Sequence, residues 1–128
     1  MSGRLSRHKA ERPAGWCTLE APDDVVTALN QIDAVKSFVV LDCLTLWLSA
    51  RFERSDEAIL MEWDSVLGAL KVGPHSGVIV GNEVGWSLVP ESFALRRFRD
   101  LAGLLGQRTA AAADETWLYV AGCPLKIK

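Results

Sequence analysis

The chain has few cysteines, no long apolar run and almost no excess of charge of either sign. Its three cysteines lie far apart and form no Cys-x-x-Cys pair, which argues against a disulfide framework and a zinc site and suits a reducing cytoplasm. Fourteen basic and sixteen acidic side chains leave a net charge of −2, so we expect no nucleic-acid partner. No apolar run approaches the roughly 20 residues of a membrane span, so we expect no such span.

The composition is that of an ordinary globular protein. Apolar residues make up 49% of the 128 residues and charged residues 23%. A disordered chain would need lower hydrophobicity and a larger charge imbalance. The length suits one hydrophobic core, so we expect a single domain over residues 1–128.

Apolar runs alternate with segments of helical spacing. Short unbroken apolar runs predict strands at 37–41, 77–81 and 116–121, with a short final strand after Gly122. Helical spacing is found at 25–32, 44–52 and 55–70, and in a long helix opened by Pro90, with an expected core face of Leu95, Phe98, Ala102, Leu105, Thr109 and Ala112. This alternation predicts an α/β fold with mostly parallel strands that are buried on both faces. Four tryptophans are expected to serve packing, namely Trp16, Trp47, Trp63 and Trp117.

Polar residues follow two of the predicted strands. Asp42 comes directly after the first, and Asn82-Glu83 follow the second. Ligands of parallel sheets bind beyond the carboxyl ends of the strands, so these side chains are candidates to line a site. Asp42 has the form of a Walker-B acid that binds Mg²⁺, or else it caps the next helix. Asn82 and Glu83 are either ligand contacts or turn residues.

One histidine stands among cations near the start of the chain. His8 is flanked by Lys9 and two arginines, with Arg12 nearby. Neighbouring cations disfavour the protonated imidazole, so we expect His8 to be neutral and nucleophilic at neutral pH. The same cations would stabilise a bound polyphosphate. A nucleophile that attacks phosphorus is one interpretation, and a solvated basic arm is the other.

Several stretches together resemble one family, the bifunctional adenosylcobinamide kinase / adenosylcobinamide-phosphate guanylyltransferases of cobalamin biosynthesis. The first resembles the family's histidine segment, with Arg4-Leu5-x-x-His8-Lys9-x-x-Arg12-Pro13-x-x-Trp16-x-Thr18-x-Glu20. The others, in the same order as in the family, are 42–49, 82–85 with Val89-Pro90, 97–103 with Gln107, 111–115 and 122–126. Only residues 50–76 contain no stretch that is specific to this family.

The resemblance implies a RecA-like P-loop fold and a homotrimer. It also implies phosphorylation of adenosylcobinamide, followed by transfer of GMP from GTP to the phosphate through a histidine–GMP intermediate. His8 matches the guanylylated histidine, and Lys9 and Arg12 match the stretch that contacts GTP. Glu20 and Asp42 match acidic residues on the nucleotide, the latter through Mg²⁺. The resemblance also implies that GTP or ATP is the phosphate donor in the kinase step.

The sequence also differs from the family in one respect. Family members begin with a strand, a Gly-rich phosphate loop and a helix, whereas these 128 residues contain no Gly-x-x-x-x-Gly-Lys-[Ser/Thr] segment. We therefore expect an N-terminally truncated form of the fold, with weak GTP binding. Two alternatives stay open. One is a catalytically impaired relic that keeps a subunit interface or weak nucleotide binding, and the other is an unrelated α/β protein that binds a small molecule.

Overall fold

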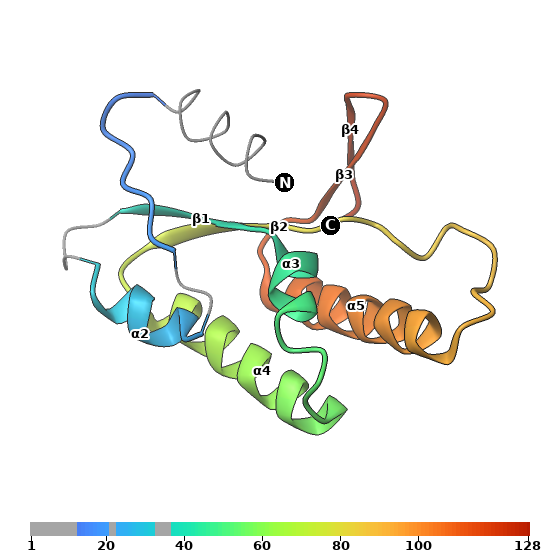
Figure 1. The fold of residues 1–128 in the computed structure, drawn as a ribbon. Coiled ribbons are helices and arrows are strands. Elements are labelled where there is room, and N and C mark those ends of the chain that lie inside the picture. Colours follow the sequence, from blue (N-terminus) through green and yellow to red (C-terminus); the bar gives the residue numbers. More distant parts are fainter. Residues whose placement is uncertain (1–12, 21–22, 33–36) are drawn as a thin grey trace.

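The computed structural model describes residues 13–20, 23–32 and 37–128, and shows eight helices and strands in those ranges (Figure 1). The predicted alternation of helices and strands is confirmed. In chain order the elements are α2 (Val25–Asn30), β1 (Phe38–Asp42), α3 (Leu44–Ser49), α4 (Asp56–Val72), β2 (Ser76–Val80), α5 (Phe93–Ala112), β3 (Trp117–Val120) and β4 (Cys123–Lys126).

The described strands form two small sheets. β1 and β2 are parallel and in register from Phe38 opposite Ser76 to Asp42 opposite Val80. β3 and β4 form a separate antiparallel hairpin. Its two-residue turn is Ala121-Gly122, with φ of 51° and 76°, the left-handed conformation at both positions that matches the twist of a hairpin. The α/β class and a parallel sheet are therefore confirmed, although the described strands do not join into one sheet.

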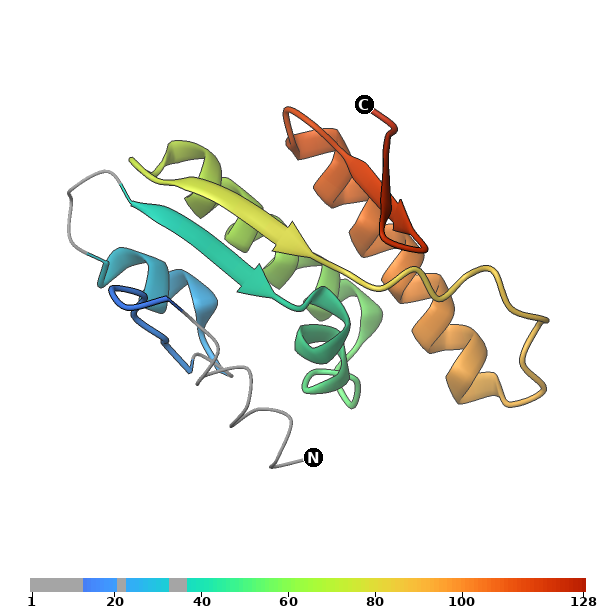
Figure 2. The same cartoon turned by 90° about the horizontal axis from the view of Figure 1, so that it is seen from above.

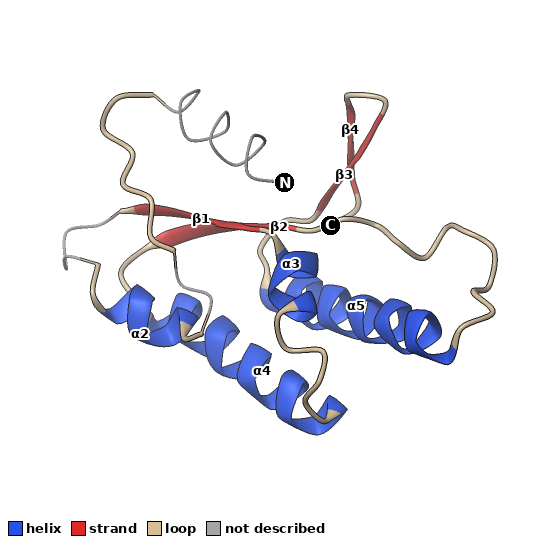
Figure 3. Cartoon of the chain, viewed as in Figure 1, coloured by secondary structure: helices blue, strands red, loops and turns tan. Residues whose placement is uncertain are grey.

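The four described helices lie on one side of the β1–β2 sheet (Figures 1 and 3). Leu41 and Ile79 point toward these helices and pack against the core. On the other face Phe38, Val40 and Val78 remain between 39% and 59% exposed. The expectation that both faces of the strands are buried is therefore wrong for the described residues. The described helices cover only one face of the β1–β2 sheet.

The core lies where α3, α4 and α5 meet. Trp47 and Trp63 pack there with their ring centroids 4.8 Å apart, as predicted. The indole N–H of Trp63 donates to Thr109 Oγ1 at 2.9 Å. The remaining buried members are Leu44, Leu48, Ile59, Val66, Leu101 and Leu105. The predicted packing roles of Trp16 and Trp117 are wrong, because both side chains are about half exposed.

Helix α5 begins later than predicted. Ser92 is its N-cap residue, and Arg96 donates to the carbonyl oxygens of Pro90 and Glu91 at 2.8 and 2.6 Å, which closes the preceding loop onto the helix. Leu101 and Leu105 are its buried residues. Leu95, predicted in the core, is exposed because the first turn of α5 projects past α3 (Figure 1).

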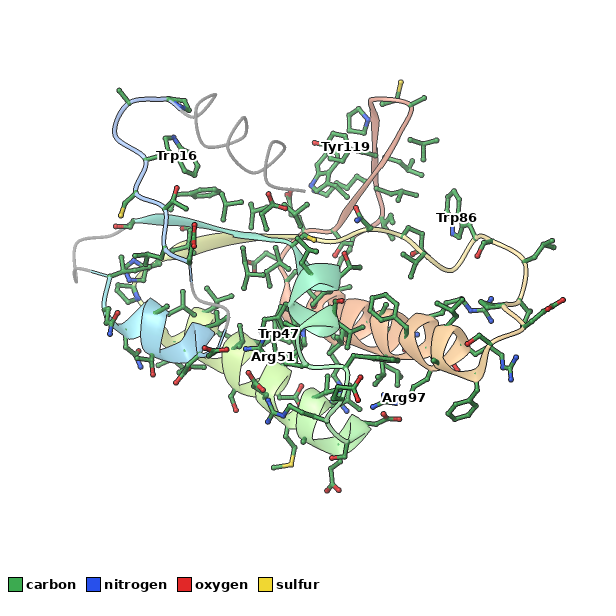
Figure 4. The ribbon with its side chains drawn as sticks, viewed as in Figure 1. Trp16, Trp47, Arg51, Trp86, Arg97 and Tyr119 are labelled. Atoms are coloured by element: carbon green, nitrogen blue, oxygen red, sulfur yellow. The ribbon has the colours of Figure 1, made fainter. Side chains whose placement is uncertain are left out.

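Two arginines fix the segment between α3 and α4 (Figure 4). Arg51 is buried, lies over the Trp47 ring and pairs with Glu62 at 2.7 Å. Arg97 pairs with Asp56 at 2.7 Å and donates to two backbone carbonyls of the segment. A buried charge is tolerated only when its donors are satisfied, so these two arginines serve the fold.

Helix α2 has a carboxylate cap. Asp24 accepts hydrogen bonds from the Thr27 hydroxyl at 2.5 Å and the Thr27 backbone N–H at 2.9 Å, and these bonds lower the pKa of Asp24. The cap therefore contributes stability above the ordinary pKa of an aspartate and loses it as the pH falls through the lowered value.

None of the helices in the described part of the chain has the length and apolar character that a membrane span requires.

Candidate functional site

Asp42 stands at the carboxyl end of β1. The end of β2 lies beside it in the register, so Asn82, just beyond β2, belongs to the same edge of the sheet (Figure 2). The Asp42 side chain is exposed and has no hydrogen bond or ion pair with a described residue. The alternative role of Asp42 as a helix cap is contradicted, because Cys43 is the N-cap residue of α3. The predicted clustering of polar groups from two strand ends is thus present.

Thr45 is a member of this edge that was not predicted. Its hydroxyl, in the first turn of α3, accepts a hydrogen bond from the Asn82 side-chain amide at 3.4 Å and lies 3.2 Å from Cys43 Sγ. This contact links the loops that follow the two strands. The signal was in the sequence, because Thr45 follows Asp42 by three residues in the stretch that resembles the family.

Glu83 folds back onto its own turn. Its Oε1 accepts the Gly85 backbone N–H at 2.6 Å, and a Cβ added at Gly85 would lie 2.8 Å from the same oxygen. A side chain at position 85 would therefore displace the exposed Glu83 carboxylate from this hydrogen bond. Glu83 is also exposed, so it has the turn role that was one of its two interpretations, and its role toward a ligand stays a prediction.

The other predicted site residues lie away from this edge or outside the described part of the chain. Glu20 is exposed on segment 13–20, which passes the outer edge of β1 (Figures 1 and 2). His8, Lys9 and Arg12 fall within residues 1–12, outside the described residues. The structure therefore brings Asp42, Asn82 and Glu83 to one end of the sheet.

The edge around Asp42 can serve a magnesium ion that is shared with a ligand. Among the residues that the structure describes, no group of three His, Cys, Asp or Glu side chains is placed to hold a metal. Mg²⁺ is usually held by one or two carboxylates together with substrate phosphates and water, and it prefers oxygen ligands. The exposed, unpaired Asp42 carboxylate fits that arrangement.

A hollow of about 510 Å³ opens beside the same loop. One wall is Gly85, in the turn that follows Asn82, and the other is the exposed side of α5. The α5 side chains and backbone that line it are Arg99, Asp100, Gly103, Leu104 and Gln107. All of these residues except Leu104 lie in stretches that resemble the family, but the cavity was not predicted, because it depends on the placement of α5 against the loop. A hollow of about 160 Å³ lies elsewhere, beside Arg51.

A family model described as "Cobinamide kinase / cobinamide phosphate guanyltransferase" matches residues 1–127. The chain belongs to this family. The resemblance of the separate stretches is thereby confirmed, and the stretches around Asp42 and Asn82 lie within the matched range.

Relatives in three bacteria bear out the membership of the cobinamide kinase / cobinamide phosphate guanyltransferase family. The "Bifunctional adenosylcobalamin biosynthesis protein CobU" of Salmonella typhimurium is 37% identical, and that of Escherichia coli is 33% identical. The "Bifunctional adenosylcobalamin biosynthesis protein CobP" of Pseudomonas aeruginosa is 35% identical. Each alignment covers all of this chain, and covers 78%, 78% and 75% of the respective relative.

Proposed function

We propose that the chain is a transferase of cobalamin biosynthesis that phosphorylates adenosylcobinamide and transfers GMP from GTP to adenosylcobinamide phosphate through a guanylylated His8. The match of the family model to residues 1–127 carries this proposal. The names of the three relatives support the pathway and a bifunctional protein, and the family description supplies the two activities.

The guanylyl transfer takes place in two displacements at one phosphorus atom. A neutral nitrogen of the His8 imidazole attacks the α-phosphorus of GTP, an N–P bond forms, and the bond to the β-phosphate oxygen breaks to release pyrophosphate. A phosphate oxygen of the corrinoid then attacks the same phosphorus, and the N–P bond breaks to return free His8. A covalent intermediate divides one difficult transfer into two easier ones.

The charges proposed around the nucleotide serve this chemistry. Lys9 and Arg12 would bind the phosphate oxygens, whose negative charge increases toward the leaving pyrophosphate. Asp42 would hold Mg²⁺ against the same phosphates, and the ion would neutralise part of their charge. Asn82 would line the site beside Asp42. Glu20, which the structure places away from that edge, is proposed as a nucleotide contact only through its match to the family.

Membership of the family adds three further features to the proposal. The fold is a RecA-like P-loop fold, the assembly is a homotrimer, and the location is the cytoplasm. The small parallel β1–β2 sheet, with functional groups at its carboxyl ends, is compatible with such a fold.

In the second candidate function, the chain is a non-catalytic relic that binds nucleotide or a subunit without transferring a group. Within these 128 residues there is no Gly-x-x-x-x-Gly-Lys-[Ser/Thr] segment. Such a segment supplies backbone N–H groups and a lysine to the β- and γ-phosphates. The 128 residues alone are therefore expected to bind GTP weakly and to show less kinase than GMP-transfer activity.

Incubation of the protein with excess GTP, Mg²⁺ and adenosylcobinamide phosphate tests the proposed function. We expect release of pyrophosphate and a corrinoid product whose mass has increased by one GMP. A parallel reaction with adenosylcobinamide and ATP or GTP tests the kinase step. Nucleotide binding without either product would instead support the non-catalytic relic.

Replacement of Asp42 by asparagine tests its role toward the magnesium ion. Asparagine keeps the size of the side chain but removes the charge. Loss of an outer-shell partner of a metal ligand already costs about 10- to 100-fold in affinity or activity, so loss of a charged ligand should cost at least as much. We expect GMP transfer by Asp42→Asn to need much higher Mg²⁺ concentrations, measured as pyrophosphate release in a Mg²⁺ titration. Asp64→Asn, an exposed aspartate on α4, serves as the control. An unchanged Mg²⁺ dependence in Asp42→Asn would contradict the role.

A further inference from the structure

Helix α5 carries four arginines, and Arg99 differs from the other three. Arg96 and Arg97 donate to backbone carbonyls, and Arg108 pairs with Asp64. Arg99 has no hydrogen bond or ion pair with any residue in the described part of the chain. Arg99, which is half-buried, instead lines the 510 Å³ hollow beside Gly85. A guanidinium with five free donors is suited to a phosphate or carboxylate.

The rest of the hollow offers complementary polar groups and open space. Asp100 and Gln107 line it and, within the described ranges, their side chains also make no hydrogen bond. A carboxylate accepts hydrogen bonds, and a primary amide both donates and accepts them. A Cβ added at Gly103 would meet no atom within 4 Å, so a ligand can approach the helix backbone closely there. These groups suit a ligand that carries an anion and several amide N–H donors.

The hollow adjoins the proposed nucleotide edge. Gly85 lies in the same turn as Asn82, and Asn82 contacts Thr45 in the helix that follows Asp42. A molecule in the hollow therefore lies next to the loops that form the edge. Transfer between two substrates requires their reacting groups to be held close together.

We propose that this hollow binds the acceptor of GMP transfer, the phosphorylated corrinoid, an inference that rests on the proposed function. Arg99 binds the phosphate group of this acceptor. Asp100 and Gln107 bind the primary carboxamides at the rim of the corrin ring. A volume of 510 Å³ is in the range of small-molecule sites.

Direct binding tests the assignment. Equilibrium dialysis with adenosylcobinamide phosphate, followed by corrin absorbance, is carried out on the wild-type protein and on Arg99→Gln, Asp100→Asn and Lys71→Gln. A hydrogen bond to a charged group contributes about 1.5–3 kcal/mol, so each of the first two substitutions should weaken binding about 10-fold or more. Lys71→Gln removes an exposed cation from α4 and should leave binding unchanged.

A second variant separates binding from folding. Gly103→Leu puts a side chain into the hollow at a helical position with free space, so it should weaken corrinoid binding without lowering the melting temperature. Arg99→Gln should also keep the wild-type melting temperature, because Arg99 has no partner among the described residues. Wild-type affinity in both Arg99→Gln and Gly103→Leu would overturn the proposal.

The GMP adduct distinguishes this inference from the proposed function. Without corrinoid, Arg99→Gln should form as much GMP–protein adduct from GTP as the wild type. Loss of that adduct in Arg99→Gln would mean that the hollow serves the nucleotide, and would overturn the assignment to the corrinoid. If the wild type forms no adduct but binds the corrinoid through Arg99, the hollow stands and the guanylyl-transfer proposal fails. If the wild type does not retain the corrinoid at all, the assignment of the hollow is wrong.

Discussion

Replacement of His8 by alanine is expected to abolish the covalent attachment of GMP to the protein. Alanine has no nitrogen to attack the α-phosphorus, and no neighbouring lysine or arginine is an equivalent nucleophile while it is protonated. Intact-mass measurement after incubation with GTP and Mg²⁺ should show an increase of one GMP in the wild type and none in His8→Ala. The same variant should produce no GMP-linked corrinoid.

The second histidine provides a matched control. His75 lies at the opposite end of the sheet from Asp42, where its Nδ1 accepts the Ser37 backbone N–H at 3.3 Å. His75→Asn keeps an acceptor near that position and should form the adduct at the wild-type level. An adduct that persists in His8→Ala, or disappears equally in His75→Asn, would contradict the assignment to His8. Release of GMP by mild acid would further identify an N–P bond.

The arrangement of helices and strands could be predicted because each element has a local signal. The unbroken run that ends at Asp42 predicted β1, and Ser55 followed by acidic residues marked the start of α4, where its side chain accepts the Ala58 N–H. Which surfaces become buried was less predictable. Leu95 has the right helical spacing for the core but lies in the turn that projects past α3.

The candidate site could likewise be predicted only in part from the sequence. Asp42 and Asn82 could be predicted to lie together, since the ends of parallel strands meet at one edge of a sheet. The hollow could not be predicted, because it depends on how α5 is placed against the turn at Gly85. The sequence also does not distinguish Arg96 from Arg99, since either could reach a phosphate from the helix. Only the contacts show that Arg96 is bonded to the carbonyls of Pro90 and Glu91, while Arg99 lines the hollow.

Replacement of Trp63 by alanine is expected to cause the largest loss of stability. Trp63 is fully buried between α3 and α5, packs on Trp47 at 4.8 Å and donates to Thr109. Removal of a buried aromatic side chain leaves a cavity and typically costs about 3–5 kcal/mol. This is a large part of the about 5–15 kcal/mol that stabilises a typical domain. Urea unfolding followed by circular dichroism should therefore give a much lower midpoint.

Two further tryptophan variants show whether this loss comes from the core. Trp86, on the loop before α5, is 74% exposed, so Trp86→Ala should change the free energy of unfolding by less than about 0.5 kcal/mol. Trp63→Phe keeps an aromatic ring but removes the indole donor to Thr109. Because that hydroxyl still donates to the Leu105 carbonyl oxygen at 2.7 Å, we expect Trp63→Phe to lose less stability than Trp63→Ala. Equal losses in Trp63→Ala and Trp86→Ala would mean that the packing of α3, α4 and α5 around Trp63 does not determine the stability of the fold.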